Sequence, residues 1–186
     1  KGQKVLIHAG SGGVGTFAIQ LAKHVGATVA TTTSTANVEL VKTLGADIAI
    51  DYKKEDFEKV LHDYDVVLNS LGKETLKKSL RVLKSGGKLI SLSGPPDPAF
   101  ASDLGASWIL KQVMGLLSYQ IRKKAKRQRV SYSFLFMRAS GDQLREISSL
   151  IDSGGIRPVV DRLFSFESTK EALAYVEKGR AKGKVI

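Results

Sequence analysis

The sequence predicts an α/β fold, in which a doubly wound parallel sheet of six strands carries helices on both faces. Three observations support this prediction. Short apolar or β-branched runs alternate with segments of helical periodicity along most of the chain. The apolar runs lack polar alternation, which is typical of parallel strands that are covered on both faces. A glycine-rich loop joins the first apolar run to the first helical segment.

Composition marks each strand, and apolar spacing of three and four residues marks each helix. The expected strands cover residues 4–8, 28–33, 47–50, 65–68, 88–92 and 130–137. The expected helices cover residues 13–24, 37–44, 55–61, 73–83 and 143–151, with one further long helix after Pro98. Right-handed crossovers between successive parallel strands would place these helices on both faces of the sheet. Glycines at 86 and 87 are expected to form a tight turn before the fifth strand.

The end of the chain has a different pattern. A strand is expected over residues 159–166 and a helix over 169–178, followed by a tail rich in glycine and basic residues. We expect residues 1–155 to form the sheet domain and residues 156–186 to form a small appendage.

Composition limits the class of protein. The chain has 186 residues, of which 42% are hydrophobic and 25% charged, as in ordinary globular proteins. It contains no cysteine, so disulfides, thiolate metal sites and cysteine nucleophiles are excluded within it. No apolar run is long enough to cross a bilayer, and a cytoplasmic location is expected. Because the chain begins with Lys1 just before the first expected strand, we expect it to be part of a larger protein.

The net charge of +11 is concentrated in the run RKKAKRQR from Arg122 to Arg129. Such a charge favours polyanionic ligands in general. The run lacks the interleaved aromatic residues of a platform for single-stranded nucleic acid, so we favour a solvated helix end and consider nucleic-acid binding the weaker alternative. The apolar residues from Trp108 to Ile121 precede it at helical spacing, which predicts a buried helix face.

A dinucleotide-binding loop is predicted between the first strand and the first helix. Gly10, Gly12 and Gly15 have the spacing G-x-G-x-x-G. In a Rossmann fold the first glycine allows the tight turn, the second lets the backbone approach a pyrophosphate, and the third lets helix and strand pack closely. The first helix would then direct free N–H groups at the phosphates.

The end of the second strand bears on which dinucleotide is bound. NAD sites usually carry an acidic residue there, which accepts hydrogen bonds from the ribose. Here the segment is TTTSTAN, which includes Thr33 and Ser34, and the first acidic residue after the loop is Glu39, inside the next helix. Hydroxyl groups can donate to a 2′-phosphate that a carboxylate would repel, so NADP(H) is the predicted cofactor. The same argument counts against a methyltransferase, which would also need an acidic residue for the ribose.

Six segments together point to a family. They are KGQKVLIHAGSGGVGTFAIQLAKHVGA, LVKTLGADIAIDY, DVVLNSLG, LKSGGKLISLSG, SGGIRPVVDRLFSFESTKEAL and EKGRAKGKVI. The chain resembles the medium-chain dehydrogenase/reductase superfamily and, within it, the zinc-independent quinone oxidoreductases of the ζ-crystallin-like branch. The resemblance covers essentially the whole chain.

This resemblance implies an activity and a domain arrangement. It implies transfer of hydride from NADPH to a quinone or an activated alkene, without a metal. It also implies that a GroES-like substrate domain is missing from this chain, and that residues 156–186 would complete it. The chain alone would then turn over little, and no catalytic residue can be named. A homodimer is implied through the edge strand from Val130 to Met137. An NADPH-binding sensor or scaffold without catalytic activity remains the alternative.

The resemblance also implies a set of cofactor contacts. The loop residues Ser11, Gly12, Gly13 and Val14 correspond to the pyrophosphate site, and Ser34 and Tyr52 to the 2′-phosphate site, although a lysine that some relatives have near Asn37 is absent. The residues implied on the ribose and nicotinamide side, or in a basic tail closing over the cofactor, are Asn69, Leu92, Ser93, Phe134, Phe136, Arg180 and Lys182. The isolated histidines His8, His24 and His62 have no metal-ligand spacing and are expected to be structural or surface residues.

Overall fold

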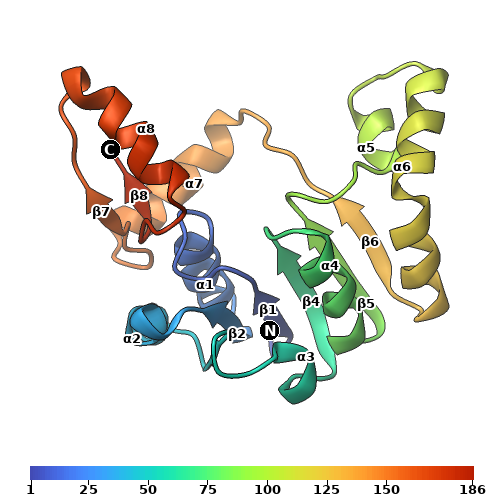
Figure 1. The fold of residues 1–186 in the computed structure, drawn as a ribbon, viewed down its shortest axis with the longest axis horizontal. Helices are drawn as coiled ribbons and strands as arrows, with labels where there is room; N and C mark the ends of the chain where they lie inside the picture. Colours follow the sequence, from blue (N-terminus) through green and yellow to red (C-terminus); the bar gives the residue numbers. More distant parts are fainter.

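The computed structural model describes residues 1–186 and contains a six-stranded sheet with the strand order β3-β2-β1-β4-β5-β6 (Figure 1). Every neighbouring pair of strands in this sheet is parallel. The order reverses beside β1, which is the switch point of a doubly wound sheet and the place where ligands bind in such folds. The predicted fold class is confirmed.

The elements of the sheet domain follow the predicted alternation. The strands are β1 Lys4–Ile7, β2 Thr28–Thr33, β3 Ile48–Asp51, β4 Tyr64–Asn69, β5 Leu83–Ser91 and β6 Ser131–Phe134. The helices are α1 Gly15–His24, α2 Val38–Thr43, α3 Phe57–Val60, α4 Lys73–Ser79, α5 Pro98–Asp103, α6 Trp108–Arg127 and α7 Gly141–Asp152, with short 3₁₀ turns at η1 Thr35–Asn37 and η2 Leu80–Val82.

Hydrophobic side chains are buried on both faces of the sheet. Adjacent residues of a strand point to opposite faces, and in β1 Leu6 and Ile7 accordingly belong to two separate clusters. The Leu6 cluster includes Leu76 of α4 and Ile121 of α6, whereas the Ile7 cluster includes Ile19 of α1. Helices therefore cover both faces, as the apolar character of the strands predicted.

The fifth strand begins earlier than predicted. β5 starts at Leu83 and passes through Gly86 and Gly87, where we expected a turn. Gly86 has a φ of 83° and donates its N–H to the Arg129 carbonyl, and the register between β4 and β5 shifts at this point. The glycines thus allow an irregularity within the strand, because their backbone can adopt a conformation that other residues avoid.

The long helix after Pro98 is two helices, α5 and α6, which are separated at Gly105 and capped by Asp97 and Ser107. The prediction that the apolar residues from Trp108 to Ile121 are buried is wrong for most of them. Trp108 is 73% exposed and Leu116 77%, whereas Ile121 is buried. Only the C-terminal half of α6 packs on the sheet, through Ser118, Ile121 and Ala125. Periodicity identifies an apolar face but not whether this chain supplies the surface that covers it.

The C-terminal segment lies beside α1, on the side of the sheet away from α6 (Figure 1). It contains β7 Val160–Arg162, η3 Phe166–Ser168, α8 Thr169–Glu177 and β8 Lys184–Val185. β7 and β8 form a separate two-stranded parallel sheet, and the short β8 was not predicted. Apolar side chains here are exposed, with Leu163 at 75% and Phe166 at 90%. The division at residue 155 stays a prediction.

Candidate cofactor-binding site

The glycine loop connects β1 to α1 through tight backbone contacts. A Cβ on Gly15 would lie 2.3 Å from the Ala9 carbonyl oxygen and 2.6 Å from the Gly10 Cα. A Cβ on Gly10 would lie 2.0 Å from the Thr31 hydroxyl oxygen. These two positions therefore require glycine for packing, which is what the motif predicts for helix and strand in close contact.

The loop leaves donors free beside the helix N-terminus. The N–H groups of Gly13 and Val14 donate to no backbone carbonyl, and the N-cap residue of α1, Val14, supplies no capping side chain. Free backbone N–H groups at the start of a helix favour a negatively charged group. The free N–H groups of Gly13 and Val14 therefore fit a pyrophosphate, whereas the Gly12 N–H donates to the Ala9 carbonyl; the contacts predicted for Ser11, Gly12, Gly13 and Val14 stay predictions.

A cleft of about 910 Å³ opens at the carboxyl ends of β1, β2 and β3. Of the predicted site residues, it brings together Ser11, Gly12, Thr33, Ser34, Tyr52, Arg180 and Lys182. Gly10 and Gly15 are buried in the turn beneath it, and Gly13 and Val14 lie in the same loop. Residues from the two ends of the chain thus meet at one site.

Side-chain amides and hydroxyls form a hydrogen-bonded cluster at one end of the cleft. The Nδ2 of Asn37 donates to the hydroxyls of Ser11, at 3.1 Å, and Ser34, at 3.2 Å. Because these oxygens accept from the amide, their own hydrogens remain available for another acceptor. The buried Oδ1 of Asn37 has no hydrogen-bond partner and lacks a donor. Hydroxyl donors beside an unpaired acceptor fit a ribose that carries a phosphate next to a free hydroxyl.

The cleft is lined by three cations and no carboxylate. Lys53, Arg180 and Lys182 line it, but no Asp or Glu does. The side chain of Glu39, the first acidic residue after the loop, is 86% exposed and pairs with Lys42 at 3.1 Å. The carboxylate of Asp51 is occupied by the hydroxyl of Thr35 at 2.7 Å. That hydrogen bond, as the main cause, lowers the pKa of Asp51. The cleft therefore favours anions.

The C-terminal tail is fastened directly to the glycine loop. The Gly183 N–H donates to the Ser11 carbonyl at 2.8 Å, and Gly183 forms a parallel β-bridge with Gly12. Gly183 has a φ of 79°, and a Cβ there would lie 2.2 Å from the Val159 carbonyl oxygen. Arg180 and Lys182 are consequently held next to the cleft, where the basic tail was predicted.

Two residues that were predicted to contact the cofactor, Asn69 and Ser93, hold a neighbouring loop instead of lining the cleft. The Asn69 Nδ2 and the Ser93 hydroxyl both donate to the Leu71 carbonyl, at 2.8 and 2.6 Å. Leu71 itself lines the cleft. The Asn69 Oδ1 is buried and has no partner, so it can accept a hydrogen bond from a ligand. Leu92 follows β5 and donates its N–H to the Asn69 carbonyl.

Phe134 and Phe136 lie apart from this cleft, at the end of β6. Phe134 pairs with Ser91 of β5, and its N–H donates to Asp97 at 3.0 Å. The rings of Phe134 and Phe136 pack around that of Phe100. Their predicted proximity to the nicotinamide stays a prediction, whereas their role in packing is visible.

His8 is a buried residue at the end of β1. Its Nδ1 lies 3.0 Å from the Thr32 hydroxyl, its Nε2 lies 2.9 Å from the Ser79 hydroxyl, and its ring meets the edge of Phe57. Burial lowers the pKa of His8 to about 4, so it is neutral at physiological pH. These contacts are those of a structural residue, although His8 also lines the cofactor cleft. His24 and His62 are exposed. No group of three or more His, Cys, Asp or Glu side chains is placed to hold a metal ion.

Sequence reasoning missed several residues of the cleft, among them Lys53, Phe57 and Thr75. Lys53 could have been found, because it comes two residues after β3 and ligands bind outside the carboxyl ends of parallel strands. Nothing in the sequence indicates Thr75. It lies inside α4, and only the packing of that helix directs it to the cleft.

Comparisons with known proteins identify a family and several similar oxidoreductases. A family model described as zinc-binding dehydrogenase matches residues 44–186. The chain is 40% identical over 192 residues to the zebrafish (Danio rerio) NAD(P)H oxidoreductase RTN4IP1, mitochondrial, with 99% of this chain and 48% of that protein covered. It is 36% identical over 189 residues to the NADPH-dependent alkenal/one oxidoreductase, chloroplastic, of Arabidopsis thaliana, with 100% of this chain and 40% of that protein covered.

Among solved structures, the quinone oxidoreductase from Coxiella burnetii superposes with a TM-score of 0.82 at 29% identity, and 100% of this chain and 52% of that chain are covered. The chain therefore spans about half the length, or less, of the proteins that it matches. The match to the family model extends over most of the chain, from just before β3 through β4, β5 and β6 to the C-terminal segment. The chain belongs to the zinc-binding dehydrogenase family, within the medium-chain dehydrogenase/reductase superfamily that its segments resemble.

Proposed function

We propose that this chain is the NADP(H)-binding half of an oxidoreductase that transfers hydride from NADPH to a quinone or an activated alkene. The observation that carries the cofactor assignment is the lining of the cleft, which holds three cations and no carboxylate beside a phosphate-binding loop. The names of relatives support the substrate class, since they include an alkenal/one oxidoreductase and a quinone oxidoreductase.

Different residues of the chain would bind different groups of the cofactor. The loop N–H groups of Gly13 and Val14 would receive the pyrophosphate, and the hydroxyls of Ser11 and Ser34 would donate to the 2′-phosphate. Lys53 and Arg180 would supply charge to it. When bound, the reduced nicotinamide supplies the hydride, and the chain's part is to position the cofactor and provide the electrostatic environment.

The substrate domain and the dimer remain part of the proposal. Residues 156–186 would complete a GroES-like domain, which is supported by the exposure of Leu163 and Phe166. A homodimer would form through the outer edge of β6, which pairs with β5 on one side only. Since the groups facing the acceptor would then lie mainly outside this chain, the chain alone is expected to bind the cofactor but turn over little.

No helix of the chain combines the length and the apolar character that a membrane span requires. A cytoplasmic location stays a prediction, and the names of two relatives place those proteins in mitochondria and chloroplasts.

The experiment is a fluorescence titration of the chain with NADPH and, in parallel, with NADH. We expect NADPH to bind about tenfold more tightly or better, since each lost charge-assisted hydrogen bond to the phosphate costs about 1.5 kcal/mol or more. Combining Ser34→Ala with Tyr52→Phe should reduce this preference, because each substitution removes a hydroxyl donor from the cleft. Equal affinity of the unmodified chain for both cofactors would contradict the NADP(H) assignment, and binding of neither would contradict the cofactor site as a whole.

The matched control for these substitutions is Ser102→Ala. The Ser102 hydroxyl donates to the Pro98 carbonyl within α5, outside the cofactor cleft. The preference for NADPH over NADH should be unchanged in this variant. A similar loss in the control and in the Ser34 and Tyr52 variant would mean that the cleft residues do not determine the preference.

A further inference from the structure

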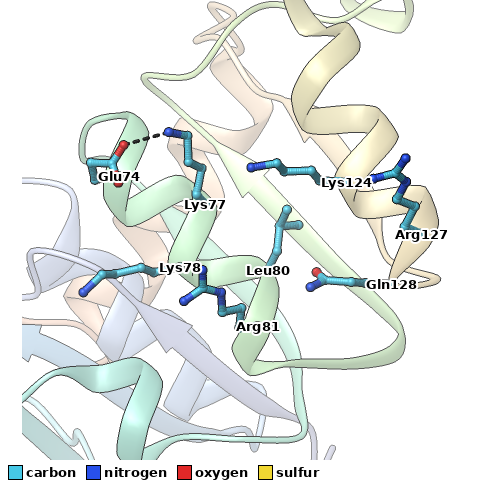
Figure 2. A pocket seen from close by; sticks show the side chains of 8 residues that line it. All are labelled: Glu74, Lys77, Lys78, Leu80, Arg81, Lys124, Arg127 and Gln128. Carbon is cyan, nitrogen blue, oxygen red and sulfur yellow. Dashed lines mark hydrogen bonds and ion pairs between the residues drawn. The ribbon is translucent and has the colours of Figure 1, made fainter.

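A second cleft lies between α4 with η2 and the C-terminal end of α6, and Figure 2 shows its side chains. Its volume is about 330 Å³. Eight residues line it, namely Glu74, Lys77, Lys78, Leu80, Arg81, Lys124, Arg127 and Gln128. None of them lines the cofactor cleft, which α4 reaches through Thr75 instead. The two clefts are therefore separate sites on either side of one helix.

Positive charge predominates in this second cleft, where five lysines or arginines face one carboxylate. On the α4 side the cations have partners in the chain. Lys77 pairs with Glu74 at 2.8 Å, and Lys78 and Arg81 both pair with Glu58, at 3.3 and 2.7 Å. On the α6 side, neither Lys124 nor Arg127 has a carboxylate within ion-pair distance. Two of the five cations thus have no ion-pair partner.

The helix dipole explains only part of this arrangement. Cations in the last turn of a helix are favourable wherever they point, and α6 ends with Lys124, Lys126 and Arg127. The same effect favours Lys77 and Lys78 in the last turn of α4, but it does not account for the meeting of two basic helix ends at one cleft. Lys124 and Arg127, which have no carboxylate partner, repel each other at one wall of the cleft, and an anion bound there removes that cost.

We propose that the cleft formed by Lys77, Arg81, Lys124 and Arg127 binds the linked phosphate groups of a small molecule, such as an inorganic or organic polyphosphate. Lys77 and Arg81 come from one wall and Lys124 and Arg127 from the other, so cations surround the bound group from both sides. Arg127 and Arg81 offer planar, forked donors that suit phosphate oxygens, and the amide of Gln128 adds a neutral donor. Leu80 is the only apolar side chain of the lining.

The placement of the remaining basic residues favours a small anion over a nucleic acid. A polymer is bound by a row of cations that follows its backbone across the surface. Here Lys123 lies over the Tyr119 ring, at 5.4 Å from its centroid. Arg122 donates within its own helix, to Gly115 and Ser118. Neither Lys123 nor Arg122 lines the cleft. The cations that do line it are therefore confined to a volume that suits a few phosphate groups.

The test is calorimetric titration of the chain with inorganic tripolyphosphate in about 0.15 M salt, where diffuse surface attraction is largely screened. Saturating NADPH is included in a parallel series to occupy the cofactor cleft. The Lys124→Ala/Arg127→Ala variant should bind tripolyphosphate about tenfold more weakly or worse. The control is Lys123→Ala/Lys126→Ala, which removes the same charge from the same helix but outside the cleft. It should differ from the unmodified chain by less than about threefold.

The outcomes separate the possibilities clearly. Selective loss in the Lys124/Arg127 variant, with and without NADPH, supports the site even if NADPH itself does not bind. Equal weakening in both variants would mean that only the general charge of the helix matters and would overturn the proposal. Absence of binding by the unmodified chain would also overturn it, as would tighter binding of a DNA or RNA duplex that both variants lose equally. All four substituted side chains are exposed, so the thermal unfolding midpoint should be unchanged.

Discussion

The Nε2 of His8 lies 2.9 Å from the hydroxyl oxygen of Ser79 and joins the end of β1 to α4. The Ser79 hydroxyl donates its own hydrogen to the Thr75 carbonyl, so it must accept from the imidazole, and the proton of the neutral ring is on Nε2. Nδ1 then accepts from the Thr32 hydroxyl, whose oxygen in turn accepts from the Ala9 N–H. The neutral imidazole thus connects the start of the glycine loop to two other elements.

This arrangement predicts a dependence of stability on pH. The pKa of His8 is about 4 in the folded chain and about 6.5 when unfolded, because burial disfavours the charged ring. Above pH 6.5 the His8 ring is neutral in both the folded and the unfolded state. Between pH 6.5 and 4 it takes up a proton only in the unfolded state. The free energy of unfolding should therefore fall by about 3 kcal/mol in total as the pH drops through this window. Urea unfolding at a series of pH values measures it.

The comparison is with His8→Gln, which should remove this slope even though its stability at pH 7 is lower. The control is His62→Gln, because His62 is exposed and should leave the slope unchanged. If the slope between pH 6.5 and 4 were the same in the His8 variant as in the unmodified chain, His8 would not be the group responsible.

The glycine loop predicts a large difference between two substitutions of the same kind. In Gly15→Ala the added carbon would lie 2.3 to 2.8 Å from backbone atoms of Ala9 and Gly10, which cannot move without separating α1 from β1. We expect a loss of about 2 kcal/mol or more in unfolding free energy. In Gly141→Ala nothing lies within 4 Å of the added carbon, and α7 gains a better helix former. Chemical denaturation of the two variants checks this, and similar stabilities would contradict the packing role of Gly15.

The attachment of the C-terminal tail predicts a variant that affects binding more than the sheet. In Gly183→Ala the new Cβ would lie 2.2 Å from the Val159 carbonyl oxygen, at a φ that side chains rarely adopt. The tail should therefore detach from Ser11 and carry Arg180 and Lys182 away from the cleft. We expect NADPH to bind about tenfold more weakly, since the charge of two cations is lost. The tail's amide hydrogens should exchange faster, while those of β1 and β4 stay protected. Unchanged affinity would mean that the tail does not contribute to the site.

Local chemistry predicted the sheet domain well because most of its elements are determined by residues within them. The β-branched run at Thr28–Thr33 became β2 with the predicted bounds, and α1, which follows the loop glycines, ends at the predicted residue. Errors occurred where distant residues decide. β8 has only two residues and exists through its pairing with β7. The N-terminal half of α6 is apolar at helical spacing but lies beyond the sheet that would bury it.

The candidate site was predictable to the extent that it lies in the loop and at strand ends. Ser34 and Tyr52 follow β2 and β3, whose carboxyl ends form one edge of the sheet. Asn69 also follows this rule, yet its amide contacts Leu71, because the direction of a side chain depends on the loop that packs against it. The cleft between α4 and α6 could not be found from sequence, since its two walls are more than 40 residues apart and only the packing of both helices on β4 and β5 joins them.

Lys53 provides the sharpest test of the cofactor preference, because its neighbour is a matched control. Lys53 lines the cleft, whereas Lys54 lies outside it, with its amine 3.9 Å from Asp51. Lys53→Ala should weaken NADPH binding about tenfold and leave NADH nearly unchanged, since only NADPH carries a 2′-phosphate. Lys54→Ala removes the same charge one residue away and should change the ratio of the two affinities by less than about twofold. Fluorescence titrations of both variants with both cofactors measure this ratio. If Lys53→Ala weakened NADPH and NADH equally, the lysine would act on a group that both cofactors share, and the 2′-phosphate would have to be held by Ser11, Ser34 and Arg180 without it.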